Sequence, residues 1–348
     1  MSIVKNQHYV PQFYLRNFSN NNKNIGMFRY KDKNYIPNSS IKSVAYSKFL
    51  YGEDGKLEHL LSTLESKWAV IIRKILESDF HSITQEDLIN LCYFIVISRT
   101  RTKKVADENK AIFNYFKELL PKDGIHNSKF NMDPSDFEEA INIPNALPID
   151  VAMKNIDILY DLDAIIIENR TNYAYITCDS PVVLYNQLYV WRNYNINYGL
   201  ASSGLQIFIP LNPKKVLCFY DPEVYNCLND EQRIIKVIAK NQVTEINKLI
   251  IHNSYDQLFF NDRTKESYIN EISKFKVSEN LDELITTYKS SKLNGELIKV
   301  GKNSIYKKIK LDFFNIKTKY KNIELPNNHA GLQRKNAISI GNRNRIEI

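Results

Sequence analysis

Apolar residues in the first half of the chain recur at the spacing of an α-helix. Between positions 56 and 77, seven of them fall three or four residues apart and form one stripe: Leu57, Leu61, Leu64, Trp68, Ile71, Ile72 and Ile75. This spacing predicts an amphipathic helix over that range. Thr84, which precedes two acids, is typical of a helix N-cap. The apolar positions after it predict a second helix that continues through Arg99 to about Leu120, before Pro121.

In the second half of the chain the pattern changes to runs of strand length. Five apolar or alternating runs follow one another with turn residues between them: 163–168, 173–177, 182–185, 205–211 and 215–220. Strands this close in sequence, without helix-length connections, favour a mainly antiparallel sheet. A helix from 230 to about 254 is expected to follow the sheet, and short helices at 133–140 and 148–160 are expected to precede it.

Two short runs near the N-terminus, 25–30 and 34–36, flank the turn Lys31-Asp32-Lys33 and predict a β-hairpin. The whole pattern predicts an α+β fold, in which the N-terminal hairpin and a helical layer pack on a mainly antiparallel C-terminal sheet. The length of 348 residues is compatible with one elaborated domain. We expect these divisions: a single domain over 1–290, a helical half at about 56–160, a sheet half at about 161–260, and a basic C-terminal extension over 291–348.

Composition narrows the class of protein. Hydrophobic residues at 43% and charged residues at 25% are typical of a globular protein. The sequence has no apolar run of about 18 residues and no signal-peptide core, so we expect a cytoplasmic protein. The four cysteines form no C-x-x-C pair, which favours reduced thiols over a zinc knuckle or a disulfide framework. The sequence also has no Gly-rich phosphate loop, G-x-S-x-G elbow or H-E-x-x-H motif, which argues against those enzyme classes.

The net charge of +8 is unevenly distributed. Residues 299–348 carry twelve Lys or Arg and three acids, whereas the preceding residues carry 35 bases and 36 acids. A basic arm on a nearly neutral body can hold a nucleic-acid backbone through salt-sensitive contacts. The alternative is a solvated tail that serves only solubility.

The stretch from Asn6 to Phe18 is the densest group of chemically capable side chains in the sequence. It includes His8 and Arg16. His8 followed by Pro11 resembles the start of a ββα-metal nuclease motif, in which a histidine activates water beside a metal. The next histidine, His59, is too distant for that compact motif. The alternative is a structural histidine under a proline-fixed turn.

Three carboxylates are candidate metal ligands. Glu58 and Glu65 lie seven residues apart at the edge of the first helical stripe, and Asp179 follows a predicted strand in a Thr-Cys-Asp-Ser-Pro turn. Together they could hold Mg²⁺ or Mn²⁺ through hard oxygen atoms. The alternatives are a structural ion-pair cluster for the two glutamates and an Asx-type turn for Asp179.

Two arginines are candidate phosphate ligands. Arg99 continues the buried stripe of the second helix, where an arginine needs a carboxylate partner. Arg16 lies in the N-terminal stretch. Their guanidinium groups suit bidentate binding of an oxyanion, and their alternative partners are the same glutamates. Cys178 lacks a neighbouring histidine in sequence, which argues against a nucleophilic thiol.

The stretch from Gln7 to Phe18 resembles the opening signature of a mostly bacterial family, domain of unknown function 4238. Shorter matches follow in the same order: Leu57-Glu58 with Glu65, Ser98-Arg99-Thr100, Thr177 to Val182, and Phe208 to Pro213. The resemblance spans about residues 5–260. Where the family usually has Asp-Asn-Pro, this chain has Asp179-Ser180-Pro181. The family implies no agreed reaction, but its association with mobile and defence genes implies a defence or toxin-type effector.

These observations lead to three functional hypotheses. The first is a metal-dependent phosphodiesterase or nuclease, with His8, Glu65, Arg99 and Asp179 as catalytic residues. The second is a non-enzymatic protein that binds a ligand or nucleic acid, in which the same residues form a structural polar cluster. The third is a hydrolase or transferase that acts on a nucleotide such as NAD. The first hypothesis requires those four side chains to line one open cleft, and the second allows a closed network.

Overall fold

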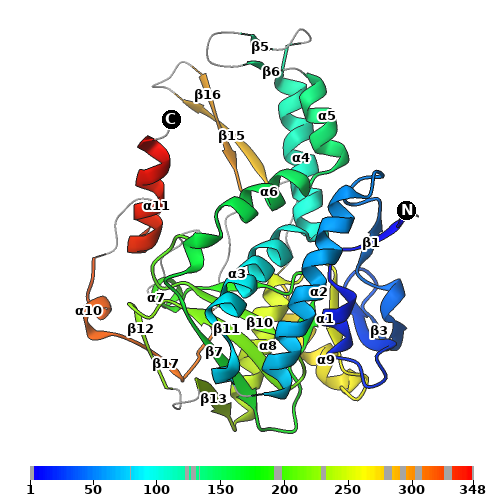
Figure 1. The fold of residues 1–348 in the computed structure, drawn as a ribbon, viewed down its shortest axis with the longest axis vertical. Coiled ribbons are helices and arrows are strands. Elements are labelled where there is room, and N and C mark those ends of the chain that lie inside the picture. Colours follow the sequence, from blue (N-terminus) through cyan, green and yellow to red (C-terminus); the bar gives the residue numbers. More distant parts are fainter. Residues whose placement is uncertain are drawn as a thin grey trace.

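The computed structural model of the chain describes residues 4–78, 80–121, 125–126, 131–132, 134–191, 198–228, 233–277, 284–290, 295–301, 308–324 and 331–346. Its architecture is α+β, which confirms the predicted class. Helices cover sheets whose strands run mostly antiparallel (Figure 1).

A five-stranded sheet forms the centre of the molecule. Its strands are, in order across the sheet, β13 (Ile234–Val237), β7 (Asp163–Asn169), β11 (Lys215–Tyr220), β10 (Gln206–Pro210) and β9 (Val183–Tyr185). β7, β11, β10 and β9 pair antiparallel, as the sequence predicted, whereas β13 runs parallel to β7. β10 is buried at every position. Both faces of the sheet are therefore covered by other elements.

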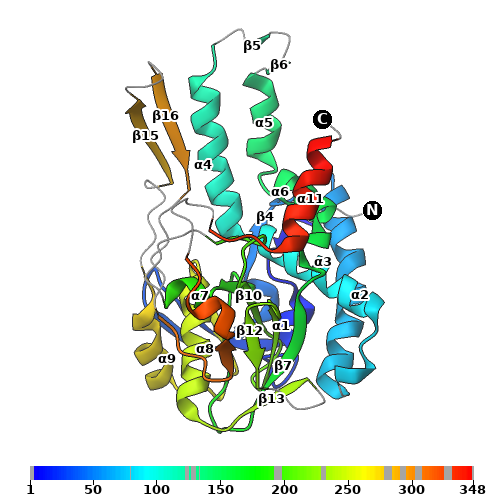
Figure 2. The same cartoon turned by 90° about the vertical axis from the view of Figure 1, so that its left-hand side faces the viewer.

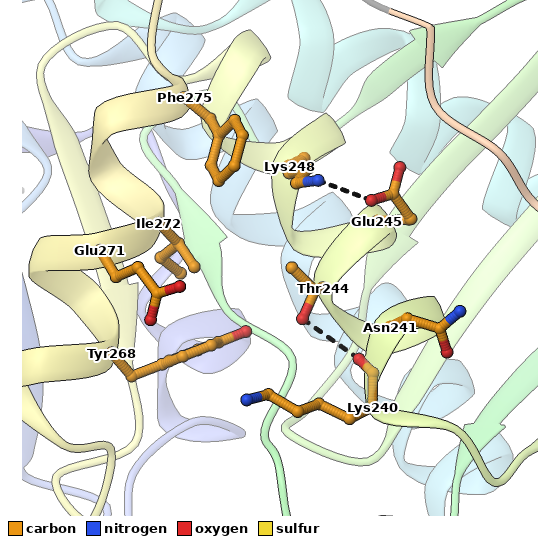
Figure 3. Close-up of a pocket in the computed structure, with 9 residues that line it drawn as sticks. All are labelled: Lys240, Asn241, Thr244, Glu245, Lys248, Tyr268, Glu271, Ile272 and Phe275. Carbon is orange, nitrogen blue, oxygen red and sulfur yellow. Dashed lines mark hydrogen bonds and ion pairs between the residues drawn. The ribbon is translucent and has the colours of Figure 1, made fainter.

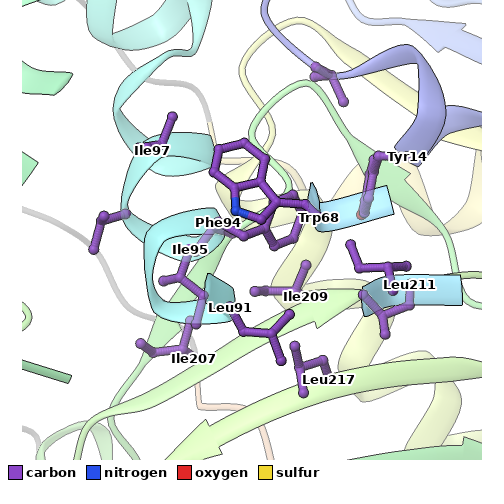
Figure 4. Close-up of a cluster of buried hydrophobic side chains, with 14 of the residues drawn as sticks. Tyr14, Trp68, Leu91, Phe94, Ile95, Ile97, Ile207, Ile209, Leu211 and Leu217 are labelled. Carbon is purple, nitrogen blue, oxygen red and sulfur yellow. The ribbon is translucent and has the colours of Figure 1, made fainter. Parts of the chain in front are cut away.

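One face of this sheet is covered by α2 (Lys56–Glu77) and α3 (Gln85–Thr100) (Figure 2). Trp68 of α2 and Phe94 of α3 meet edge to face, with ring centroids 5.5 Å apart. Figure 4 shows both rings over Ile207, Ile209 and Leu217 of the sheet. Each fully buried side chain of this kind contributes about 1.5–3 kcal/mol of transfer free energy. This contact holds the helical layer on the sheet.

The opposite face is covered by α8 (Lys240–Asn253). Val243, Ile246 and Ile250 of this helix are buried in one cluster with Phe208 and Cys218 of the sheet. The five-stranded sheet therefore lies between two helical layers, one more than the sequence predicted.

A second sheet contains the predicted N-terminal hairpin. Its antiparallel strands are, in order, β3 (Asn34–Ser40), β2 (Asn24–Arg29), β14 (Gln257–Phe260) and β8 (Thr177–Cys178). The hairpin prediction is confirmed. A Cβ atom at Gly26 would lie 2.4 Å from the Phe260 ring, so this close approach of β2 and β14 requires glycine.

The helix boundaries confirm one prediction and correct another. α2 has the predicted range, and the Thr84 side chain and Asp87 form a capping box at the start of α3. The predicted continuation through Arg101 is wrong. α3 ends at Thr100, and α4 (Lys103–Leu119) begins anew after Thr102, whose Oγ1 accepts a hydrogen bond from Val105 N at 3.3 Å. This break positions the Arg101 side chain in the interior.

Two further predictions are corrected in the second half. The predicted helix from 230 to 254 is a strand, β13, followed by the shorter helix α8. The β-branched residues Ile234, Ile235 and Val237 suit a strand that lies in register beside β7. Only the end of the predicted strand over 173–177 is a strand, β8. The preceding residues do not form a regular series of strand hydrogen bonds; Tyr175 N, for example, donates to Pro213 O.

Part of the predicted basic extension is built into the domain. β17 (Phe314–Ile316) pairs with β12 (Tyr225–Cys227), and Phe314 is buried. Arg334 is 3% exposed, and its Nε lies 3.0 Å from both carboxylate oxygens of Asp161. These described parts of the extension are therefore anchored by burial and by an ion pair.

The other elements that the structure describes are shorter or lie at the periphery. They are β1 (Asn6–His8), α1 (Gln12–Arg16), η1 (Ile41–Ser43), β4 (Tyr46–Lys48), η2 (Phe80–Ser82), β5 (Ile125–His126), β6 (Asn131–Met132), α5 (Pro134–Asn142), α6 (Ala146–Lys154), η3 (Ile156–Leu159), α7 (Gln187–Val190), α9 (Glu266–Ile272), η4 (Ser273–Phe275), β15 (Ile285–Ser290), β16 (Gly295–Val300), α10 (Thr318–Lys321) and α11 (Lys335–Ile346). Among the described residues, no helix combines the length and the apolar composition needed to cross a bilayer.

Candidate functional site

The N-terminal stretch enters the body as a short ribbon. β1 pairs antiparallel with β4, and His8 lies opposite Tyr46. Gln7 is fully buried, where its Nε2 donates to Gly52 O at 2.9 Å and its Oε1 accepts from Tyr51 N at 2.6 Å. A buried amide with both ends paired fixes the position of the strand. His8, the next residue, is thereby positioned at the surface of the domain.

A second anchor of this stretch is Tyr14 in α1. Its buried hydroxyl donates to Pro210 O at 2.5 Å and lies 2.7 Å from Thr177 Oγ1. Tyr14, Thr177 and Pro210 belong to three of the segments that carry the family resemblance. These three residues meet in a buried hydrogen-bond network. The role of the Tyr14 hydroxyl is therefore structural.

Arg101, which was not among the residues predicted from the sequence, is the centre of a buried polar cluster. Its side chain is 1% exposed. Nη1 donates to Glu65 Oε1 at 2.6 Å, Nη2 to His8 O at 2.7 Å, and Nε to Tyr51 Oη at 3.2 Å. Burial alone would lower the pKa of Arg101, but Tyr51 and Glu65 outweigh it and raise the pKa. The charged guanidinium therefore joins β1, α2 and the junction of α3 and α4. We call Arg101, Glu65, Tyr51 and the His8 carbonyl the Arg101 network.

Arg99 does not have the environment that the sequence predicted. Its residue is exposed, whereas Arg101 is buried. The helix ends between the two residues, so the chain turns Arg101 inward. The predicted pairing of an arginine with Glu65 is therefore made by Arg101. Thr102, an N-cap residue type two positions after Thr100, was the signal in the sequence for this break.

The side chain of His8 is oriented by a chain of hydrogen bonds from the surface. Arg16 Nη2 donates to Gln12 Oε1 at 3.1 Å. The amide nitrogen of Gln12 then faces His8 Nδ1 at 3.3 Å and donates to it. This arrangement assigns the proton of the neutral ring to Nε2. His8 in this tautomer is a hydrogen-bond donor at Nε2 and not a base or metal ligand there.

Burial keeps His8 neutral. It lowers the pKa of His8 below the usual value of a histidine, although the carbonyl of Ile41 and the charge of Glu65 act in the opposite direction. His8 Nε2 is buried, and no described residue forms a hydrogen bond with it. A buried donor without a partner carries a desolvation cost, so it is a candidate contact for a ligand.

Glu58 differs from Glu65 in its pairing. Glu65 is bound to Arg101, whereas Glu58 Oε2 is buried without a hydrogen-bond partner. Burial raises the pKa of Glu58; the charge of Arg101 opposes this rise and that of Glu65 adds to it. The two glutamates lie near each other, as the sequence predicted, but only one of them is in the ion pair.

We expect the Glu58→Gln variant to be more stable than the wild type at pH 7, by a melting-temperature difference of about 1–3 °C. The folded-state pKa of Glu58 lies above its unfolded value of about 4.3, so the ionised carboxylate is disfavoured in the folded protein at neutral pH. This cost disappears as the pH falls below the unfolded pKa. Thermal melts at pH 7 and pH 4.5 should therefore show a larger gain at pH 7. The exposed Glu53→Gln variant is the control, and an equal gain at both pH values would contradict the assignment.

Asp179 is held in a closed set of contacts. Its residue is 2% exposed, and its carboxylate accepts from the backbone amides of Tyr255 at 2.7 Å, Asp256 at 2.6 Å and Gln257 at 2.8 Å. Burial raises the pKa of Asp179, while these three bonds lower it in part. The carboxylate thus binds β8 to the loop before β14. It does not make the local Asx-type turn that the sequence offered as an alternative.

Tyr9 is close enough to Asp179 and to Tyr51 of the Arg101 network to interact with both electrostatically. Tyr9 is 3% exposed, and burial is the largest cause of its raised pKa. The charges of Asp179 and Asp256, and Tyr51, raise this pKa further. Asp179 is therefore a neighbour of the Arg101 network through Tyr9, but its oxygens are turned to backbone amides. His8 and Glu65 thus meet at Arg101, whereas Asp179 is buried and bound to backbone amides.

The predicted Mg²⁺ or Mn²⁺ ligands do not fit a metal site. In the described ranges, no group of three or more His, Cys, Asp or Glu side chains is arranged to hold a metal ion. Glu65 Oε1 is bound to Arg101, and both oxygens of Asp179 accept backbone hydrogen bonds. Glu58 Oε2 is buried without a hydrogen-bond partner among the described residues. We derive no metal-dependent step from them.

A groove of about 330 Å³ lies elsewhere, between α8 and the α9–η4 segment (Figure 3). It contains charges of both signs, and Lys248 pairs with Glu245 at 2.6 Å. Lys240 Nζ lies 4.4 Å from the ring centroid of Tyr173. The lining residues are Lys240, Asn241, Thr244, Glu245, Lys248, Tyr268, Glu271, Ile272 and Phe275, and none of them was predicted as a site residue.

The comparisons with known proteins identify the family and nothing closer. No curated protein and no solved structure matches the chain. A family model matches residues 6–264, which include the whole Arg101 network, Asp179 and both larger sheets. The resemblance noted in the sequence is thereby confirmed. The chain belongs to the family described as Protein of unknown function (DUF4238).

Proposed function

We propose that the chain is a nucleic-acid-binding protein in which the polar residues around Arg101 are structural and not catalytic. The observation that carries this proposal is the closure of the Arg101 network. All three nitrogens of the guanidinium donate to groups of the same chain, and Asp179 accepts three backbone hydrogen bonds. Three of the five N–H groups of the guanidinium and both carboxylate oxygens of Asp179 are thus bonded within the chain, so these groups are held by the protein itself and are not presented to a metal or a phosphate.

The charge distribution supports a polyanionic partner. Residues 1–50 carry eight Lys or Arg and a single acid, and residues 299–348 carry twelve bases and three acids. Both ends of the sequence are therefore strongly basic, while the intervening part is acidic. Separation of charge on this scale concentrates positive potential on parts of the surface and attracts a phosphate backbone.

Fluorescence anisotropy with a labelled duplex of about 20 base pairs tests this function. We expect binding by the wild-type chain that weakens steeply between 50 and 200 mM salt, because each phosphate contact releases counterions. A single-stranded oligonucleotide of the same length serves as the comparison. Absence of binding to any of duplex DNA, duplex RNA and single strands at low salt would refute the proposal.

A phosphodiesterase is the second candidate, and one observation favours it. His8 Nε2 and Glu58 Oε2 are both buried and have no hydrogen-bond partner among the residues that the structure describes. Burial raises the pKa of Glu58, as in a carboxyl group that donates a proton to a substrate, while the neutral ring of His8 offers its Nε2–H as a hydrogen-bond donor. Cleavage of DNA or RNA, with or without Mg²⁺ or Mn²⁺, that is lost in both His8→Ala and Glu58→Gln would favour this candidate over simple binding.

A further inference from the structure

Four exposed cations lie on segments of the N-terminal part of the chain that adjoin the strand of His8. They are Arg16 of α1, Lys23 before β2, Lys42 of η1 and Lys48 of β4. We call them the N-terminal basic face. Within the described part of the chain, no carboxylate forms an ion pair with any of the four. Their charges are therefore available to a partner.

Backbone pairing and hydrogen bonds bring these residues together. Asn6 pairs with Lys48, and His8 pairs with Tyr46. Because side chains alternate along a strand, the side chains of these two pairs lie on the same side of the ribbon. Lys23 O accepts from the amide of Ile41, which precedes Lys42.

Arg16 joins the same face through Gln12, whose amide contacts the His8 ring. The carbonyls of Ile41 and Lys42 also act on His8, so η1 lies beside the ring. Arg16, Lys42 and Lys48 thus belong to segments that contact His8 or its ribbon, and Lys23 is bound through its backbone to η1.

Acids are scarce at this face. The only acid in residues 1–50 is Asp32, which pairs with Arg29 at 2.5 Å in the β2–β3 hairpin. On α2, which packs beside α1, Glu65 is bound to Arg101, and Glu58 has a raised pKa. The nearest acids in the turn after β4 are Glu53 and Asp54, and Asp54 pairs with Lys56 at 3.2 Å. Among the described residues, the four cations of the face therefore outnumber the unpaired carboxylates of these neighbouring segments.

The basic residues of the C-terminal part have a different status. Lys319 pairs with Glu223 at 3.0 Å, Lys317 Nζ donates to Pro222 O at 2.6 Å, and Arg334 is buried. Several basic residues that the sequence assigned to a free arm are thus bound to other groups of the same chain. In Figure 1, β1 and α1 lie on the right of the molecule, and α10 and α11 lie on the left. The two basic regions are separate surfaces.

We infer that the N-terminal basic face binds the phosphate backbone of a double-stranded nucleic acid. This inference rests on the proposed function and names the surface that performs it. The aromatic ring at the face, Tyr46, is only half exposed and packs beside His8 with ring centroids 5.8 Å apart. A stacking platform for unpaired bases needs an open ring face. Lysines and an arginine without such a platform suit the backbone of a duplex, which they contact independently of sequence.

The test compares two triple charge reversals in the full-length chain. Lys23→Glu/Lys42→Glu/Lys48→Glu removes three cations of the face and leaves the Arg16–Gln12–His8 hydrogen bonds intact. Lys308→Glu/Lys310→Glu/Lys335→Glu is the matched control, since these three residues are exposed in the C-terminal part. Anisotropy with one labelled duplex, as DNA and as RNA, is measured across a salt series for both variants and the wild type.

The face variant is expected to weaken duplex binding roughly 100-fold at 100 mM salt and to reduce the slope of log K against log salt by about three. The control is expected to change affinity by less than about threefold. Wild-type affinity in the face variant, with loss in the control, would assign binding to the C-terminal part and overturn the inference while the proposed function stands.

Two other results also overturn the inference. If the wild type binds vesicles containing anionic phospholipid and no nucleic acid, the face recognises a membrane and the proposed function fails with it. Tighter binding to the single strand than to the duplex would show that bases and not paired backbones are recognised. Circular dichroism and thermal melts of each variant confirm that loss of binding does not come from loss of the fold.

Discussion

Replacing Arg101 by methionine is expected to lower the free energy of unfolding by about 3–5 kcal/mol. The substitution keeps an unbranched side chain but leaves the Glu65 carboxylate without its cation and the His8 carbonyl without its donor. Breaking a buried ion pair by removing one partner costs more than the net contribution of the pair, because a charge remains buried. Urea denaturation of the purified chain measures this loss.

The control for this prediction is Arg99→Met, two residues away in the sequence. Arg99 is exposed, and substitutions of exposed residues usually change stability by less than about 0.5 kcal/mol. A loss of 3 kcal/mol in the Arg99 variant, with little change in the Arg101 variant, would contradict the description of the network. Arg101→Met/Glu65→Met should recover part of the loss, because it removes both charges.

Replacing Asp179 by alanine is expected to cost about 3 kcal/mol, since the carboxylate is the acceptor for three backbone amides in a buried loop. Asp179→Asn retains one oxygen acceptor and should lose less. Hydrogen exchange provides a local measurement: the amides of Tyr255, Asp256 and Gln257 should exchange faster in the alanine variant.

The position of Asp256 offers a comparison for Asp179. Its backbone amide is one of the three donors, and its own side chain is half exposed. Asp256→Ala should therefore leave the loop protected from exchange. If Asp179→Ala were as stable as the wild type but abolished a nucleic-acid cleavage activity, Asp179 would be catalytic, as in the first functional hypothesis.

The elements that could be predicted from the sequence are those determined by local patterns. The stripe of α2 and the capping box of Thr84 require only neighbouring residues, and both were predicted correctly. β13 was missed because its apolar residues also suit a helix, and its choice of strand depends on β7, some 70 residues earlier. The end of α3 was not predicted because the apolar pattern contains no glycine or proline there. The only local sign of the break is Thr102, the N-cap residue of α4.

Two members of the Arg101 network were named from the sequence, but its central arginine was not. His8 and Glu65 do belong to one polar cluster, and an arginine does pair with Glu65. Two residues in succession along a helix rotate the side-chain direction by about 200°, so Arg99 and Arg101 point in nearly opposite directions. The end of α3 at Thr100 lies between them, and Arg101 is the one that points inward. The partners of Asp179 are backbone amides about 76 residues later in the chain, and no residue type in the sequence marks them.

The central claim is that the Arg101 network is structural and that the chain binds nucleic acid without cleaving it. The most direct test measures binding and cleavage in the same incubation. Wild type and Glu65→Gln, both held well below their melting temperatures, are incubated with a labelled duplex and with Mg²⁺ or Mn²⁺. Anisotropy then reports binding, and a denaturing gel reports cleavage. We predict that both proteins bind the duplex with similar affinity and leave it intact, while Glu65→Gln unfolds at a lower temperature. Metal-dependent cleavage by the wild type that is abolished in Glu65→Gln would contradict a structural role for the Arg101 network.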